Sequence, residues 1–284
     1  MKLAFSTVAC PDRTLTGVVE LAKALDVNGI ELRTFGDDSA HFAPDPCLTS
    51  FPKIREMLLD AGLEPATLAT SIRYDARISP PIVGRMIGDP ERAVRETKRF
   101  IEVATQIESP FVRVFGFELS GKESRRSGLR RIVDRLAKAA DCAHNTGVRL
   151  LLENGGSFPT AEDLAEIIDR VASPMLAAAY SPSVAQAVGE DPITGIDSLD
   201  GMLESVKLKD FDGTKPVPIG TGEMQCRETV EHLARNDYQG WAVIEWDRLW
   251  LDDLTPAQEA LPGMVDDVFS WYAGACTRAH AACV

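Results

Sequence analysis

Residues 218–245 read PIGTGEMQCRETVEHLARNDYQGWAVIE, which is a turn, a segment of helical period and a short apolar run in that order. Gly220 and Gly222 lie in the turn, and the helical period predicts a helix over residues 227–236. The apolar run predicts a strand over residues 241–246. The stretch therefore contains one helix followed by one strand, which is the unit from which parallel α/β sheets are built.

The same alternation of short apolar runs and longer helical segments covers the chain and indicates a parallel sheet. Strands are predicted at residues 1–6, 29–34, 64–70, 111–115, 148–153, 175–180, 205–209 and 241–246. Helices are predicted at residues 14–25, 48–61, 90–106, 124–145, 160–171, 192–202, 227–236 and 256–275. Eight such units in about 275 residues close naturally into a (β/α)8 TIM barrel of the α/β class. An open doubly wound sheet is disfavoured, because no GxGxxG follows the first strand.

The length and charge of the chain limit its organisation and partners. A chain of 284 residues can form one large core, so we expect a single domain, 1–284, with a frayed tail at residues 276–284. The formal net charge of −13 argues against nucleic acid and membrane as partners, since both require a concentrated positive surface. No segment approaches the roughly 20 apolar residues that span a bilayer, and the first residues lack the apolar core of a signal peptide. We expect a cytoplasmic protein.

Candidate catalytic residues are the polar side chains at the carboxyl ends of the strands, where barrel active sites lie. These residues are Ser6, Glu31, Arg33, Thr70, Arg113, Glu153, Asn154, Tyr180, Ser181, Lys207, Lys209, Asp210, Glu245 and Asp247. Glu153 and Glu245 each end an otherwise apolar strand, where a charge is costly without a partner. Two carboxylates across a barrel mouth suit proton removal and delivery on opposite faces of a substrate carbon. The alternative is that each is only paired with a nearby cation.

Three motifs make the chain resemble a known superfamily. They are Gly147-Val148 before LLENGG, VKLKD at residues 206–210 and, above all, the stretch 218–245. Over essentially its whole length the chain is similar to the sugar phosphate isomerase/epimerase superfamily of xylose isomerase-like barrels, which includes ketose 3-epimerases, hydroxypyruvate isomerases and dehydroshikimate dehydratases. The resemblance implies an isomerase or epimerase in sugar metabolism that acts on a small sugar or hydroxy-keto substrate. It also implies a possible homodimer or homotetramer, since such assemblies are common in these families.

The resemblance also implies a metal site, from which this chain departs. Superfamily members usually hold Mn2+, Mg2+ or Zn2+ with Glu, Asp, His and Glu from strands five to eight. By the resemblance, the two glutamates correspond to Glu153 and Glu245, whereas Ser181 and Lys207 stand in place of the aspartate and the histidine. An ammonium beside two carboxylates would repel a divalent ion and leave fewer than the usual protein ligands. We therefore predict no tight metal site and no other cofactor, with Lys207 in place of the metal.

Several roles are open for Lys207. As a cation between Glu153 and Glu245, it would hold a developing oxyanion while these glutamates transfer a proton α to the carbonyl of a small polyhydroxylated substrate. A dehydratase or lyase would instead use Lys207 as an imine, which requires a neutral amine that a second cation such as Lys209 favours. In the third possibility the lysine is a structural ion pair in a non-catalytic ligand-binding barrel.

Further residues are expected to bind substrate at the mouth. The planar fork of Arg113 suits a carboxylate or phosphate, although a structural pairing with Glu153 is equally open. Glu31 and Arg33 either pair with each other or line the mouth.

Ser181, Lys209 and Trp246 complete the predicted substrate-binding set. The indole of Trp246 follows the last strand and would form an apolar wall against a sugar ring, or a subunit contact. The loop 72–90 is rich in arginine and is a candidate lid, which suggests an anionic substrate.

Overall fold

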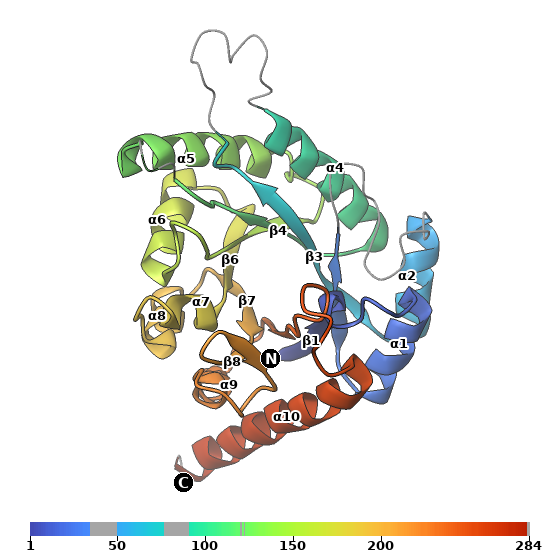
Figure 1. The fold of residues 1–284 in the computed structure, drawn as a ribbon. Helices are drawn as coiled ribbons and strands as arrows, with labels where there is room; N and C mark the ends of the chain where they lie inside the picture. Colours follow the sequence, from blue (N-terminus) through green and yellow to red (C-terminus); the bar gives the residue numbers. More distant parts are fainter. Residues whose placement is uncertain (35–49, 77–90, 120, 122, 283–284) are drawn as a thin grey trace.

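The computed structural model describes residues 1–34, 50–76, 91–119, 121 and 123–282. Eight parallel strands in these residues close a barrel in the order β1-β10-β7-β6-β5-β4-β3-β2 (Figure 1). Their bounds are β1 (Lys2–Ser6), β2 (Gly29–Arg33), β3 (Glu64–Arg73), β4 (Phe111–Phe115), β5 (Arg149–Glu153), β6 (Leu176–Tyr180), β7 (Leu203–Leu208) and β10 (Trp241–Ile244). The prediction of a TIM barrel is confirmed.

Helices surround the barrel and alternate with its strands along the chain (Figure 1). They are α1 (Leu15–Ala24), α2 (Phe51–Asp60), α4 (Arg92–Ile107), α5 (Arg125–Asp141), α6 (Ala161–Val171), α7 (Pro182–Gln186), α8 (Pro192–Ser198), α9 (Cys226–Arg235) and α10 (Ala257–Ala282), with a short 3-10 turn η1 (Thr7–Ala9). A hairpin of β8 (Asp210–Asp212) and β9 (Lys215–Val217) follows β7. Among the helices that are described, none has the length and apolar character needed to cross a membrane.

Several segments differ from the prediction, among them the β8–β9 hairpin, which was not expected. The tail expected to fray at residues 276–284 is helical as far as Ala282, because its many alanines favour helix α10. Helix α7, which the sequence reading missed, begins directly after Ser181 with a proline in its first turn. Strand β3 continues to Arg73, so the first residues of the candidate lid belong to the barrel, and residues 77–90 of that lid lie outside the described residues.

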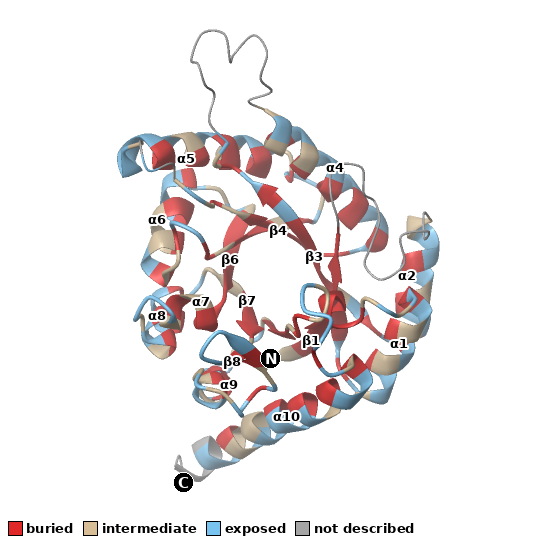
Figure 2. Ribbon diagram, in the orientation of Figure 1, coloured by how far each residue is buried: buried red, intermediate tan, exposed pale blue. Residues whose placement is uncertain are grey.

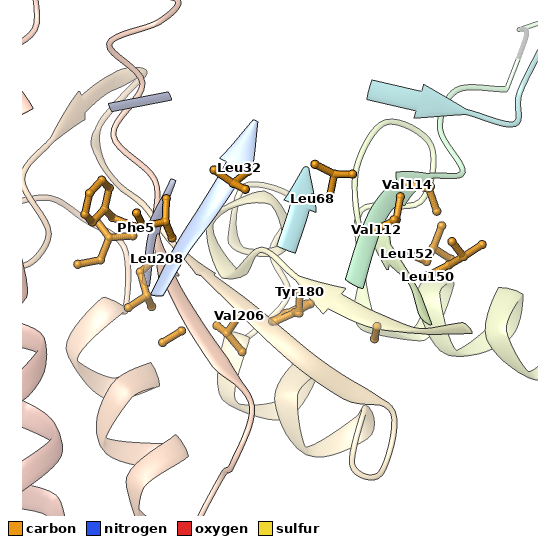
Figure 3. Close-up of a cluster of buried hydrophobic side chains, with 14 of the residues drawn as sticks. Phe5, Leu32, Leu68, Val112, Val114, Leu150, Leu152, Tyr180, Val206 and Leu208 are labelled. Atoms are coloured by element: carbon orange, nitrogen blue, oxygen red, sulfur yellow. The ribbon is translucent and has the colours of Figure 1, made fainter. Parts of the chain in front are cut away.

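Side chains alternate across the barrel wall and form two hydrophobic clusters. The outward-facing side chains pack against the surrounding helices in one large cluster, part of which Figure 3 shows around Leu32, Val112 and Leu208. The inward-facing side chains form a second cluster that consists of Ala4, Ala66, Phe111, Leu151, Ala177, Ala179, Trp241 and Val243. Figure 2 shows the strands as almost wholly buried. Side chains two residues apart on a strand lie on the same face of the sheet. The residue two positions after each of these inward side chains therefore also points into the barrel.

Asp210 fixes the turn that contains Gly220 and Gly222. Its Oδ2 accepts backbone N–H groups from Gly220 at 2.8 Å and Gly222 at 3.0 Å, and its Oδ1 accepts those of Phe211 at 2.9 Å and Met224 at 3.0 Å. A Cβ on Gly222 would lie 2.3 Å from Asp210 Oδ1, so the turn requires glycine there. Asp210 lies two residues after the outward-facing Leu208, so its side chain points to the same side. This explains why this strand-end candidate supports a turn instead of lining the mouth.

Replacing Asp210 by Asn should therefore lower the free energy of unfolding. The amide would keep one acceptor oxygen and direct its NH2 at two backbone donors, so we expect a loss of about 2–4 kcal/mol. Urea denaturation measures it, with Asp212→Asn as the control, because Asp212 is exposed in the same hairpin. Equal losses for the two variants would contradict the anchoring role of Asp210.

Candidate active site

Because side chains alternate along the strands, a set of ionisable residues points into the barrel mouth. The inward-facing ionisable residues are Glu31 and Arg33 of β2, Arg113 of β4, Glu153 of β5, Lys207 of β7 with the following Lys209, and Glu245 and Asp247 after β10. Four carboxylates thus face four cations. Most of these side chains are deeply buried, with Glu31 1% and Lys207 2% exposed. Such burial requires that each charge has a partner, because an isolated buried ion is strongly destabilising.

Lys207 lies at the centre of this arrangement. Its Nζ donates a short hydrogen bond to Glu31 Oε1 and another of 2.7 Å to Glu245 Oε2. The predicted contact with Glu245 is confirmed, whereas the second carboxylate is Glu31 and not Glu153. Two strands, β10 and β1, lie between β7 and β2 in the barrel order, and the small inward side chains of β1, Ala4 and Ser6, leave room for Lys207 to reach Glu31.

Lys209 forms a second cationic contact with the same glutamate. Its Nζ donates to Glu245 Oε1 at 3.0 Å and to Asp247 Oδ1 at 2.9 Å. The sequence places Lys209 and Asp247 at strand ends, and the structure brings them together. Glu245 is consequently bound through both oxygens, one to each lysine.

Arg113 links the third carboxylate to the network. Its Nη1 donates to Glu153 Oε2 at 3.2 Å and lies 3.8 Å from Glu245 Oε2, and its Nη2 donates to the carbonyl of Thr70 at 3.2 Å. The pairing of Arg113 with Glu153 is confirmed. Binding of a substrate anion by this guanidinium stays a prediction.

The two residues of β2 have different neighbours. Glu31 pairs with Lys207, while Arg33 Nη1 donates to the carbonyl oxygens of Thr34 and Ala69, both at 2.9 Å. Burial and the nearby charge of Arg113 lower the pKa of Arg33 to about 10, so the guanidinium remains protonated at neutral pH.

The charges around Glu245 fix its ionisation. Burial alone would favour the neutral acid, but Lys207, Lys209 and Arg113 outweigh it and hold the pKa of Glu245 well below 4.5. Burial likewise opposes the charge of Lys209, yet Glu245 and Asp247 raise its pKa above the ordinary value of 10.5. At neutral pH Glu245 is therefore a carboxylate that accepts a proton with difficulty, and Lys209 is an ammonium that gives one up with difficulty.

A cavity of about 520 Å3 opens beside these charges. Glu153, Lys207, Lys209, Glu245 and Ser181 are among its lining residues. Its other lining residues are Gly156, Pro159, Ser183, Val184, Ala187, Val188, Phe211, Gly213, Thr214 and Met224. Binding of substrate by Ser181 stays a prediction. The volume lies within the range of small-molecule sites. The sequence reading missed the apolar members, although the i, i+3, i+4 spacing of Val184, Ala187 and Val188 is a helical signal that could have found them.

The prediction that Trp246 forms a wall of the mouth is wrong. Its side chain is 4% exposed within the large hydrophobic cluster, and its Nε1 donates to the carbonyl of Thr255 at 2.8 Å. Trp246 has the outward parity of Ala242 and Ile244 on β10, and this parity directs it toward the helices.

The side chains at the four positions that the resemblance assigns to a metal do not fit a divalent ion. Glu153 already pairs with Arg113, and Glu245 pairs with Lys207 and Lys209. The Ser181 hydroxyl lies 3.3 Å from that of Ser183. Within the described ranges, no group of three or more His, Cys, Asp or Glu side chains is arranged to hold a metal. An ion entering here would have to displace fixed cations from both glutamates.

Comparisons with known proteins agree with this architecture. The chain matches the family model described as "Xylose isomerase-like TIM barrel" over residues 19–265. It is similar to the structure of L-ribulose 3-epimerase, with a TM-score of 0.80 and 16% identity over 100% of this chain and 98% of that one. For the D-psicose 3-epimerase of Clostridium cellulolyticum H10 with D-tagatose, the TM-score is 0.73 and the identity 14%, over 97% and 99% of the two chains.

A further similar structure is the probable 3-DHS dehydratase AsbF of Bacillus anthracis, with a TM-score of 0.75 and 15% identity over 95% of this chain and 99% of that chain. No curated protein sequence matches the chain. At these identities the structural likeness shows a shared fold, and the reaction must be argued from the side chains at the mouth.

Removing the buried ammonium should destabilise the protein strongly. We expect Lys207→Met to lower the free energy of unfolding by about 3–5 kcal/mol, because Glu31 would remain buried without its cation. The double variant Glu31→Gln/Lys207→Met should recover part of this loss. Lys2→Met is the control, since its pairing with Glu64 is exposed, and it should cost less than about 1 kcal/mol. Equal losses in urea denaturation for the two single variants would contradict the role of Lys207.

The low pKa of Glu245 predicts a pH dependence of stability. Because the pKa is lower in the folded than in the unfolded protein, ionised Glu245 stabilises the fold above about pH 4.5, and the contribution is lost as the pH falls through the folded value. The difference in unfolding free energy between the wild type and Glu245→Gln should therefore shrink below that pH. Urea denaturation between about pH 7 and about pH 3 measures it. A constant difference across this range would contradict the lowered pKa.

Proposed function

Because the chain belongs to the xylose isomerase-like TIM barrel family, we propose that it is an isomerase or epimerase that moves a proton next to the carbonyl of a small hydroxylated substrate without a divalent metal. The observation that carries this proposal is Lys207, whose ammonium lies 2.7 Å from Glu245 at a position where a histidine ligand is expected from the resemblance. The epimerases of similar fold support the reaction class.

Glu153 is the proposed base. It lines the cavity, its side chain is 12% exposed, and its Oε2 accepts from Arg113. Glu245, in contrast, is held ionised by three cations and is poorly suited to exchange a proton. The lowered pKa of Glu245 favours a division of roles in which Glu153 takes the proton and Glu245 positions the two lysines.

Lys207 and Lys209 are the proposed partners of the developing oxyanion. Both line the cavity, and both are oriented by carboxylates before any substrate arrives. Donors that are fixed in place stabilise developing charge without the cost of reorganisation. The same contacts support this electrostatic role over an imine at Lys207, because a Schiff base requires an amine that is free to attack the carbonyl.

The number of bases determines the stereochemical outcome. If Glu153 alone removes and returns the proton, the proton stays on one face of the intermediate and the reaction is an isomerisation. If Glu245 acts as the second acid/base group, as the sequence predicts, the proton can arrive on the opposite face and the reaction is an epimerisation.

Proton exchange in D2O tests the proposal. The ketols L-ribulose, D-psicose, D-tagatose, dihydroxyacetone and 2-hydroxyacetophenone are incubated with protein in EDTA, and deuterium next to the carbonyl is followed by NMR. We expect exchange with at least one ketol, and a rate lowered about 10²-fold or more in Glu153→Gln, as is typical for loss of a general base. Glu64→Gln is the matched control, because Glu64 is exposed at the amino end of β3, whereas the mouth lies at the carboxyl ends of the strands.

Three outcomes would contradict the proposal. Exchange that appears only when Mn2+ or Mg2+ is supplied would show a metal-dependent reaction. Exchange that survives in Glu153→Gln would place the base elsewhere. If no ketol exchanges its proton for deuterium, with or without metal ions, the protein is better explained as a non-catalytic ligand-binding barrel.

A further inference from the structure

The cavity at the mouth is lined by side chains of two kinds. Four are the ionisable groups Glu153, Lys207, Lys209 and Glu245, which are described above. The apolar ones come from three separate segments. These are the α7 region with Val184, Ala187 and Val188, the β8–β9 hairpin with Phe211, and the following turn with Met224. Of these side chains, Phe211 lies beside the charges, with its ring centroid 5.9 Å from Lys209 Nζ.

The apolar side is held in place by a hydrogen-bonded link. Gln186 at the end of α7 donates from Nε2 to the carbonyl of Glu223 at 3.0 Å, and its Oε1 accepts the backbone N–H of Gln225 at 3.1 Å. The turn that carries Met224 is anchored in addition by Asp210. The apolar wall is therefore formed before a ligand binds, and the hydroxyls of Ser183 and Thr214 line the same cavity.

Val188 makes this wall unusual for a protein surface. It is 57% exposed at the rim of the cavity, and it is among the few large apolar side chains so exposed in the described residues. Exposed apolar surface in a small, well-formed pocket is typical of a site that an apolar ligand group covers.

A fully hydroxylated sugar fits such a wall poorly. Each hydroxyl that leaves water and faces Val184 or Val188 loses hydrogen bonds without replacement, which disfavours binding. A hydrocarbon group in the same place gains from leaving water. The charged groups, in contrast, require oxygen atoms that can meet two ammonium groups.

We propose that the substrate of this site is a ketol with a hydroxylated carbonyl end and a hydrocarbon far end, such as an aryl or alkyl group. The carbonyl end lies against Lys207 and Lys209, and the hydrocarbon covers Val184 and Val188. The chemistry at the carbonyl end rests on the proposed function, but recognition of the hydrocarbon end can be measured separately as binding.

A matched pair of ligands tests the proposal. Dihydroxyacetone and 2-hydroxyacetophenone share the HOCH2–C=O unit and differ in a hydroxymethyl against a phenyl group. Calorimetric titration should give a dissociation constant for 2-hydroxyacetophenone at least about tenfold lower, since even one methylene in an apolar pocket is worth roughly 10-fold or more.

A variant at Val188 tests whether the apolar wall causes the preference for 2-hydroxyacetophenone. Val188→Ser should weaken binding of 2-hydroxyacetophenone about threefold to tenfold while leaving dihydroxyacetone unchanged, because it removes apolar contact area. Since Val188 is exposed, the fold should tolerate the change. Leu59→Ser is the matched control, because Leu59 is 68% exposed on α2 and does not line the cavity.

The outcomes separate the two proposals. Equal or tighter binding of dihydroxyacetone would overturn the inference, as would the absence of binding by 2-hydroxyacetophenone at millimolar concentration. The inference also fails if Val188→Ser and Leu59→Ser behave alike. Tight binding of 2-hydroxyacetophenone without proton exchange would support the substrate class and overturn the proposed reaction.

Discussion

The requirement that buried charges be paired inside a closed barrel governs the mouth of this protein. Inward positions on the parallel strands alternate with outward ones, so an ionisable residue at an inward position cannot turn toward solvent through the wall. Glu31 and Lys207 can therefore be buried inside the barrel only because they pair with each other, and Lys207 also contacts Glu245. This constraint explains why Arg113, Lys207 and Lys209 are connected to one another through the carboxylates that they share.

The same alternation decides what could be predicted from the sequence. The barrel was predictable, because eight apolar runs separated by helical segments leave few other ways to bury the strands. The meeting of Lys207 and Glu245 was predictable from their positions at strand ends. The choice of Glu31 over Glu153 was not, because Glu153 is the nearer in the barrel order, with one strand between β5 and β7 against two strands between β2 and β7. The contact with Glu31 depends on how the side chains pack inside the barrel. The error at Trp246 was avoidable, because its parity with Ile244 is visible in the sequence.

The apolar wall and the charged network act on the same cavity. An apolar surface beside the lysines lowers the local dielectric and strengthens their interaction with an oxyanion. The turn anchored by Asp210 contributes to both features, because Asp210 follows Lys209 in the chain and the turn carries Met224 into the wall. The glycine-rich turn, which first indicated the fold, is thus also part of the site.

The pairing of Lys207 with Glu31 has a consequence for how such a site can change over evolutionary time. A histidine at position 207 would supply the missing type of metal ligand, yet it would leave the carboxylate of Glu31 buried without its ammonium. Glu31 would have to change as well, and the lysine and arginine beside Glu245 and Glu153 would still hold those carboxylates. A divalent metal site at this mouth therefore requires several substitutions together, so the ion pairs inside the barrel limit what a single mutation can introduce there.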